Sequence, residues 1–283
     1  MKQKKIFVLI MMLICSVSHA GITKVVVWEH TLYKPNLIST TLFQALDITK
    51  AEYGDYEIIS SHPMPQDRAL KEISNGKLDV GHFIATEERE KNALVIRIPI
   101  MQGLLGYRIC LIKEGNQHIF DNITNQVEWI EKNITIGQQT NWPDTEILKT
   151  NGFNVATTFK YELLFQQLAK ERFTCFARGA NEINREFIEY DTLDLAIEKN
   201  IVIYYPFPLF YFVNPHNKML AERLELGLNR LQQNGTANKL FEQNFSYILH
   251  ELSLDKRHIL KLNNPTLSTE TINAINHFPM LKK

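Results

Sequence analysis

The stretch LDVGHFIATEEREKN, residues 78–92, places a strand-like run directly before a highly charged turn. The apolar run ends at Ile84, and Thr86 then stands where it can cap a short helix. Arg89 falls in the first turn of that helix, among three glutamates and a lysine. One interpretation is a surface turn, since glutamates are favoured near a helix N-terminus. The other interpretation turns Arg89 inward to bind an anion, while Glu87, Glu88, Glu90 and Lys91 face water.

Strand and helix patterns alternate on both sides of this stretch. Residues 24–29 (KVVVWE) and 56–60 (YEIIS) are strand-like, and apolar residues such as Leu42 and Leu46 recur between them at helical spacing. With residues 78–84 they form a β-α-β-α-β series, which predicts a mostly parallel sheet covered by helices.

A second α/β pattern follows the long strand-like segment 103–112. Asp144 is expected to cap one of its helices, and residues 253–283 are expected to form a loosely packed tail. Between the second α/β pattern and this tail, an apolar helical stripe runs through Leu220, Leu224, Leu228 and Leu231.

The N-terminus has the features of a secretory signal peptide. Three lysines precede an apolar run over residues 6–15, and small residues stand before a cleavage point at Gly21. Cleavage removes three lysines and no acids from a chain with 31 basic and 31 acidic residues, which leaves a net charge of −3. The chain has no surplus of basic residues, so neither nucleic acid nor anionic lipid is expected as a partner.

Three further motifs stand in the order used by a known class of proteins. NGKLDV precedes TEEREKN, IPIMQGLLGYRICLIKEG follows, and LAERLELGLNRLQQNGTANKLFEQNF comes last. In this order, residues 23–248 resemble periplasmic solute-binding proteins of type 2, the amino-acid-binding, family 3-like class. The resemblance implies an α/β fold of two lobes, with two crossing hinge strands and a ligand cleft between the lobes. It places residues 21–108 and 210–262 in lobe 1 and 109–209 in lobe 2, with 263–283 as a C-terminal tail.

The resemblance also implies which residues contact the ligand. Arg89 matches the arginine that grips the α-carboxylate of an amino acid, for which the planar guanidinium fork is suited. Thr86 either adds a hydroxyl or only caps the helix, and Arg68 either faces the cleft or pairs with Asp67 or Glu72. The remaining candidates lie in loops that follow strands: Glu29, His30, Tyr33, Gln66, Asn141, Trp142, Arg178 and Glu182.

The sequence departs from the pattern of amino-acid binders at the ammonium site. Arg178 stands where the family generally has an aspartate, and His30 takes the usual place of an acid in the first loop. A cleft with Arg68, Arg89 and Arg178 suits an anionic ligand, unless Glu182 or Glu29 restores the missing negative charge.

Two cysteines remain after signal cleavage, Cys110 and Cys175. We predict that they stay reduced, because they fall in strands assigned to different lobes or to the hinge; a disulfide is the alternative. Neither has a histidine or second cysteine at metal-ligand spacing, so no metal site is expected.

We therefore predict a monomeric periplasmic binding protein that captures a small polar ligand, anionic or amino-acid-like, for an ABC transporter. The alternative is a stand-alone periplasmic sensor or accessory protein of the same fold. A cleft enzyme of the dehydratase kind is less favoured, since no nucleophile elbow or glycine-rich phosphate loop is present, and no cofactor is expected.

Overall fold

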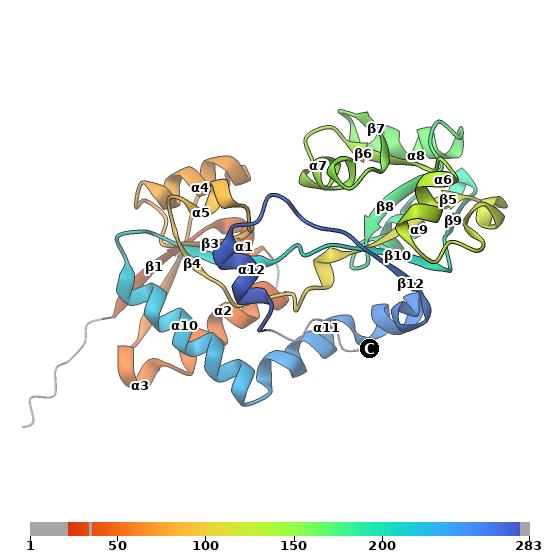
Figure 1. Ribbon diagram of the computed structural model, residues 1–283. Coiled ribbons are helices and arrows are strands. Elements are labelled where there is room, and N and C mark those ends of the chain that lie inside the picture. Colours follow the sequence, from red (N-terminus) through yellow and green to blue (C-terminus); the bar gives the residue numbers. More distant parts are fainter. Residues whose placement is uncertain (1–21, 34–35, 278–283) are drawn as a thin grey trace, which may run out of the picture.

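The computed structural model describes residues 22–33 and 36–277 and consists of two α/β lobes (Figure 1). The predicted signal peptide lies outside the described residues. Lobe 1 is built on a five-stranded sheet of order β2-β1-β3-β11-β4. Its strands are β1 (Thr23–Val27), β2 (Tyr56–Ser60), β3 (Val80–Ile84), β4 (Leu94–Ile96) and β11 (Leu209–Val213). Its helices are α1 (Glu29–Leu32), α2 (Leu37–Asp47), α3 (Lys50–Tyr53), α4 (Gln66–Ser74), α5 (Glu87–Glu90) and α10 (Lys218–Gln233).

Lobe 2 is built on a seven-stranded sheet of order β12-β10-β5-β8-β6-β7, with β9 paired to β5. Its strands are β5 (Tyr107–Lys113), β6 (Thr135–Gln139), β7 (Asn154–Thr158), β8 (Cys175–Gly179), β9 (Leu195–Ile197), β10 (Ile201–Tyr204) and β12 (His258–Lys261). Its helices are α6 (Gln126–Glu131), α7 (Pro143–Thr150), α8 (Tyr161–Ala169) and α9 (Ile183–Glu189). The last helices of the chain are α11 (Thr236–Leu252) and α12 (Thr269–Ile275).

The sequence patterns of lobe 1 explain its helices. Asn36 begins α2 with a capping box, in which its side chain accepts a hydrogen bond from the backbone N–H of Ser39. Leu42 and Leu46 of α2 are fully buried, as their spacing predicts. The predicted leucine stripe of α10 is buried as well, and α10 packs along α2. Strands β2, β1 and β3 are parallel, which follows the β-α-β-α-β pattern.

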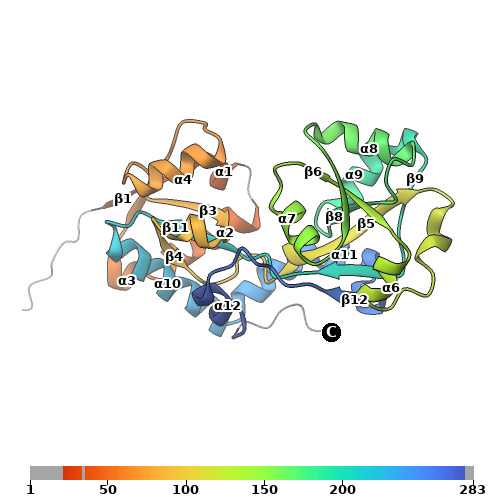
Figure 2. The same ribbon diagram turned by 45° about the horizontal axis from the view of Figure 1, so that its top comes forward.

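Two of the segments that cross between the lobes are residues 97–106 and 205–208 (Figure 2). They touch where the backbone N–H of Tyr205 donates to the carbonyl oxygen of Gly106 at 3.3 Å. A side chain at Gly106 has no room, because its Cβ would lie 2.2 Å from the carbonyl oxygen of Tyr205. The glycine therefore permits the close contact of the two crossing segments.

The C-terminal region differs from the expectation. Strand β12 pairs in parallel with β10 and so belongs to the sheet of lobe 2, whereas the sequence placed residues 210–262 in lobe 1. The tail is not loosely packed either, because Leu267 and Ile275 are buried in the core of lobe 1. The short apolar run at 258–262 finds a partner in the edge strand β10, a pairing that local patterns do not reveal.

The prediction that the cysteines stay reduced is wrong. Cys110 and Cys175 form a disulfide with a Cα–Cα distance of 5.1 Å. Both lie in lobe 2, on the neighbouring antiparallel strands β5 and β8. Antiparallel pairing brings their Cα atoms well inside the roughly 7 Å that a disulfide allows. Within the described ranges, no helix has the length and apolarity to cross a membrane.

Candidate functional site

A cavity of about 530 Å³ lies between the lobes. We call it the central cavity. Lobe 1 contributes the start of α4, the end of β3 and α5, and lobe 2 contributes the starts of α7 and of the segment after β8. Such loops at the carboxyl ends of strands are where ligands bind in open α/β sheets. The lining residues are Gln66, Asp67, Ile84, Arg89, Leu105, Arg108, Asn141, Trp142, Pro143, Asp144, Arg178, Asn181, Glu182 and Phe207.

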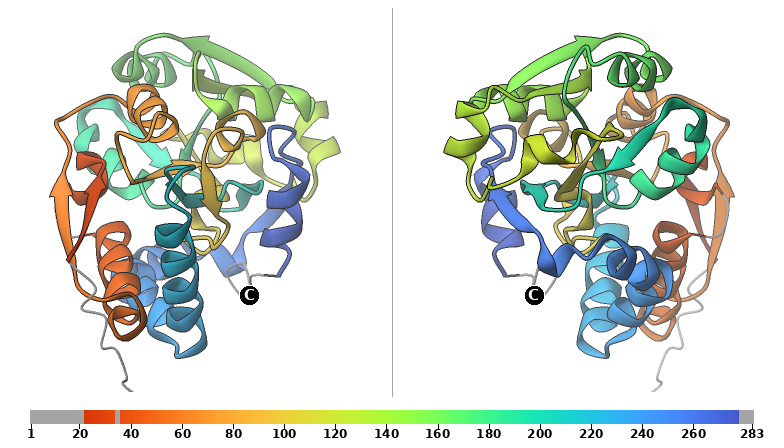
Figure 3. Two further views of the ribbon diagram at one scale, coloured as in Figure 1. Left: turned by 90° about the vertical axis from the view of Figure 1, so that its left-hand side faces the viewer. Right: turned by 90° about the vertical axis from the view of Figure 1, so that its right-hand side faces the viewer.

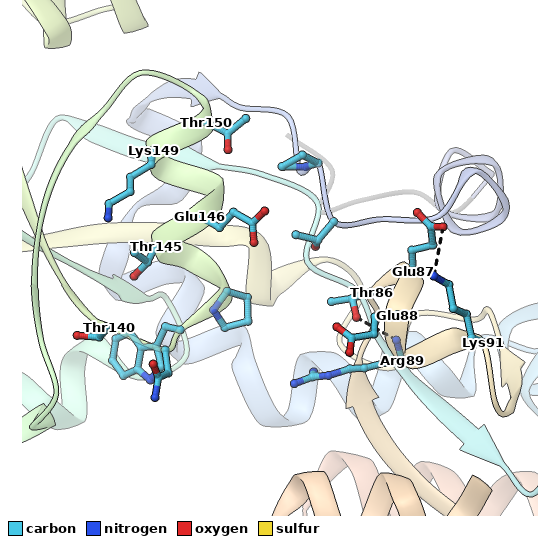
Figure 4. A pocket seen from close by; sticks show the side chains of 15 residues that line it. Thr86, Glu87, Glu88, Arg89, Lys91, Thr140, Thr145, Glu146, Lys149 and Thr150 are labelled. Atoms are coloured by element: carbon cyan, nitrogen blue, oxygen red, sulfur yellow. Dashed lines mark hydrogen bonds and ion pairs between the residues drawn. The ribbon is translucent and has the colours of Figure 1, made fainter.

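Arg89 reaches the central cavity from α5, a helix of one turn. Thr86 caps this helix by accepting a hydrogen bond from the backbone N–H of Arg89 at 3.2 Å. The guanidinium donates from Nη1 to the carbonyl oxygen of Ile84 at 3.0 Å. Figure 4 shows the side chain extending from α5 toward the lobe that carries Thr140, whereas Lys91 lies beside Glu87.

The charge of Arg89 has no ion-pair partner in the described part of the chain. Among the residues that the structure describes, no carboxylate oxygen lies within 4.0 Å of its guanidinium. Burial lowers the pKa of Arg89, and the more distant charges of Asp67 and Glu88 oppose this effect. The guanidinium of Arg89 is therefore a half-buried cation with N–H groups still available to bind an anion.

The acids around Arg89 do not all face water. Glu87, Glu88 and Lys91 are exposed, as the sequence predicts. Glu90 was expected to be exposed too, but it is buried and accepts hydrogen bonds from Arg97, Ser268 and Thr271. The expectation failed because two of the three partners of Glu90, Ser268 and Thr271, come from the C-terminal region.

Arg178 lines the central cavity but is not available as an anion-binding fork. Its Nε and Nη2 atoms donate to the two carboxylate oxygens of Glu186, each at 2.6 Å, and Nη2 also lies 3.0 Å from Glu182 Oε2. Burial alone would lower the pKa of Arg178, but the hydrogen bonds that it donates to Glu186 and the charge of Glu182 outweigh this effect and raise the pKa. Tyr161 donates to the same carboxylate of Glu186 at 2.6 Å.

Arg108 and Asp144 form a second buried ion pair, which the sequence did not indicate. Arg108 of β5 lies 2.8 Å from Asp144 Oδ1, and its Nε donates to the hydroxyl of Tyr205 at 2.9 Å. Tyr205 in turn donates to Asp144. Asp144 therefore does not cap α7, whose N-cap is Trp142. The available signal was an arginine inside an otherwise apolar strand, which needs a charged partner when buried.

Polar side chains of the central cavity crowd around Gly179. A Cβ built on this glycine would lie 2.7 Å from Asn181 Oδ1, 2.9 Å from Arg108 Nη1 and 3.0 Å from Glu182 Oε2. Asn181 Oδ1 is buried and has no hydrogen-bond partner among the residues that the structure describes. A buried acceptor of this kind is costly unless a donor satisfies it. Asn181 and Glu182 thus offer two acceptors to a donor group of a ligand.

The other predicted residues divide into two groups. Gln66, Asn141 and Trp142 line the central cavity. Arg68 does not line it. Its side chain is 65% exposed, and its Nε lies 3.7 Å from Glu72 Oε1. Of the two alternatives that the sequence left open, Arg68 therefore forms the surface pair and does not face the cleft.

The first loop of lobe 1 does not line the central cavity. Tyr33 and His30 are exposed, and His30 stacks on His82 and lies tilted against Trp28. Glu29 donates its backbone N–H to Ser61. The pKa of His82 is lowered to about 4, by burial and then by the proximity of His30, so this ring is neutral at ordinary pH.

A second, outer cavity of about 720 Å³ adjoins the central one and shares Arg89 with it (Figure 4). Thr86 lines this outer cavity, and so do Pro265 and Thr266 of the C-terminal region. Within the described part of the chain, no group of three or more histidine, cysteine or acidic residues is placed to hold a metal ion.

Comparison with known proteins identifies the fold. No protein-family model matches the sequence, and the curated proteins contain no match. Solved structures do match. The probable amino-acid ABC transporter extracellular-binding protein YtmK of Bacillus subtilis is 14% identical, with a TM-score of 0.59 over 79% of this chain and 98% of that one. An ancestral arginine-binding protein bound to glutamine is 20% identical, with a TM-score of 0.50 over 80% of this chain and 98% of that one.

A third match is a binding component of an ABC transporter from Wolinella succinogenes, complexed with lysine. It is 13% identical, with a TM-score of 0.52 over 80% of this chain and 96% of that one. The two-lobed α/β fold predicted from the sequence is therefore confirmed.

Proposed function

We propose that this chain is a periplasmic solute-binding protein that captures a small amino-acid-like ligand between its lobes. The observation that carries the proposal is the guanidinium of Arg89 at the wall of the central cavity, which is not ion-paired with any of the described residues. A ligand carboxylate there would gain charge-assisted hydrogen bonds without displacing an existing ion pair. The matched proteins bound to glutamine and to lysine support an amino-acid ligand for this fold.

The charges around the central cavity favour a ligand that carries both a negative and a positive group over a ligand that is only an anion. Its lining contains three arginines and three acids, and Arg108 and Arg178 are already paired with carboxylates. The sequence alone suggested a cleft with several free arginines. With one available cation, a ligand carboxylate pairs with Arg89, and a ligand ammonium or amide lies toward Asn181 and Glu182.

We infer that the protein works in the periplasm and delivers its ligand to an ABC transporter. The match to YtmK supports this role, because that protein is described as the extracellular-binding part of an amino-acid transporter. Binding between two lobes joined by crossing segments also implies closure around the ligand. The chain acts by binding, and catalysis is not part of the proposal.

A thermal-shift screen of residues 21–283 tests the proposed function. The panel contains amino acids, polyamines, dicarboxylates and phosphorylated metabolites. A ligand at one hundred times its dissociation constant should stabilise the protein by roughly 2.7 kcal/mol. We expect shifts with one or more amino acids and none with polyamines, which carry no anionic group. Shifts confined to dicarboxylates or phosphorylated compounds, or no shift at all, would contradict the proposal.

A further inference from the structure

The chain returns from lobe 2 to lobe 1 a second time near its C-terminus. We call residues 262–275 the C-terminal crossing. It leaves lobe 2 after β12 and ends in α12 on lobe 1, along one side of the molecule (Figure 3). On the lobe 2 side, Asn263 exchanges two hydrogen bonds with Asn151 at the end of α7, at 3.1 and 2.7 Å. Asn264 then donates to the carbonyl oxygen of Pro206, in the second crossing segment, at 2.8 Å.

The other end of the C-terminal crossing is fixed to lobe 1. Ser268 and Thr271 donate to the two carboxylate oxygens of Glu90, at 2.7 and 2.8 Å. Arg97 adds a charged donor to the same carboxylate at 2.7 Å. Leu267 and Ile275 are buried in the core beneath, so the attachment is apolar as well as polar.

Helix α5 depends on its contacts with the C-terminal crossing. It has one turn, and a helix of that length is not stable in isolation. The backbone N–H of Glu87, which has no partner inside α5, donates to the carbonyl oxygen of Thr266 at 2.8 Å. The C-terminal crossing therefore contacts α5 at its first residue, Glu87, and at its last, Glu90. Arg89 lies between these two attachments.

We propose that Glu90 is a positioning residue, which fastens α5 and with it Arg89 to the C-terminal crossing. Only Pro265 separates Asn264, held by the second crossing segment, from Thr266, held by α5. Proline has a fixed φ and adds little slack. The placement of Arg89 thus depends on a segment that is attached to both lobes. This inference concerns how Arg89 is held, and its test uses ligand-free protein, so its outcome is separate from that of the ligand screen.

The test compares the double variant Ser268→Ala, Thr271→Val with Thr269→Val. Thr269 is exposed on the same helix and serves as the matched control. Losing two hydrogen bonds to a buried carboxylate should raise amide hydrogen exchange at Glu87 and Glu90 by about tenfold or more. Exchange in β3 should stay unchanged. In an NMR spectrum of arginine Nε–H groups, the Arg89 signal should move in the double variant and stay in place in the control.

Two results would overturn the proposal. One is exchange in α5 and an Arg89 signal identical to those of the unmodified protein. The other is faster exchange throughout lobe 1, including β3, which would show that the contacts serve overall folding alone. If the double variant does not fold, Glu90→Gln decides, because it keeps the size of the side chain and weakens the hydrogen bonds. It should move the Arg89 signal in the same direction, and an unmoved signal would reject the positioning role.

Discussion

Glu186→Ala is expected to lower the free energy of unfolding by roughly 3–5 kcal/mol, the scale for removing one partner of a buried ion pair. The substitution leaves the guanidinium of Arg178, whose side chain is 8% exposed, without its two shortest hydrogen bonds. It also removes the acceptor of the Tyr161 hydroxyl. Glu182 remains, but its side chain is 36% exposed and makes a single contact with Arg178 at 3.0 Å. Urea denaturation of the ligand-free protein measures the loss.

Glu189→Ala is the matched control for this measurement, because Glu189 is exposed on the same helix, α9. It should change the free energy of unfolding by less than about 0.5 kcal/mol, as surface substitutions usually do. An equally small effect of Glu186→Ala would mean that Arg178 does not depend on Glu186. In that case Arg178 would again be a candidate anion site, as the sequence suggested.

Replacing both Cys110 and Cys175 with alanine is expected to destabilise the protein by about 4 kcal/mol. The disulfide closes a loop with a sequence separation of 65 residues, and its main effect is to restrict the unfolded chain. Denaturation with and without a reducing agent measures the effect on the unmodified protein. The alanine variant is the control, since a reducing agent should leave its stability unchanged. Two titratable thiols in protein purified without a reducing agent would contradict the disulfide.

Local patterns predicted those parts of the fold that local physics determines. The capped helix α2 and the leucine stripe of α10 follow from periodicity, because burial of one helix face sets the spacing of apolar residues. The position of Arg89 beside the cavity followed from its register, just after a strand end and a capping threonine. These features depend on neighbours within a few residues along the chain.

The features that the sequence did not reveal depend on contacts between residues that lie further apart along the chain. The disulfide arises from the antiparallel pairing of β5 with β8, whereas the two cysteines seemed to belong to different lobes or the hinge. Arg178 looked like a free cation because its neutralising partner, Glu186, lies one loop and one helical turn away. Glu90 looked solvent-exposed because the hydroxyls that bind it lie nearly 180 residues later, with separations of 178 and 181.

Isothermal titration calorimetry on Arg89 variants tests the central claim most directly, with the amino acid that gives the largest shift in the screen. Arg89→Ala should weaken binding by roughly 2–5 kcal/mol, because the ligand carboxylate loses a charged partner in the cleft. Arg89→Lys should restore part of the affinity, since an ammonium cannot reproduce the two parallel hydrogen bonds of the guanidinium. Lys91→Ala, two residues away and exposed, is the control and should bind like the unmodified protein. If folded Arg89→Ala binds as tightly as Lys91→Ala, Arg89 does not hold the ligand and the account is wrong.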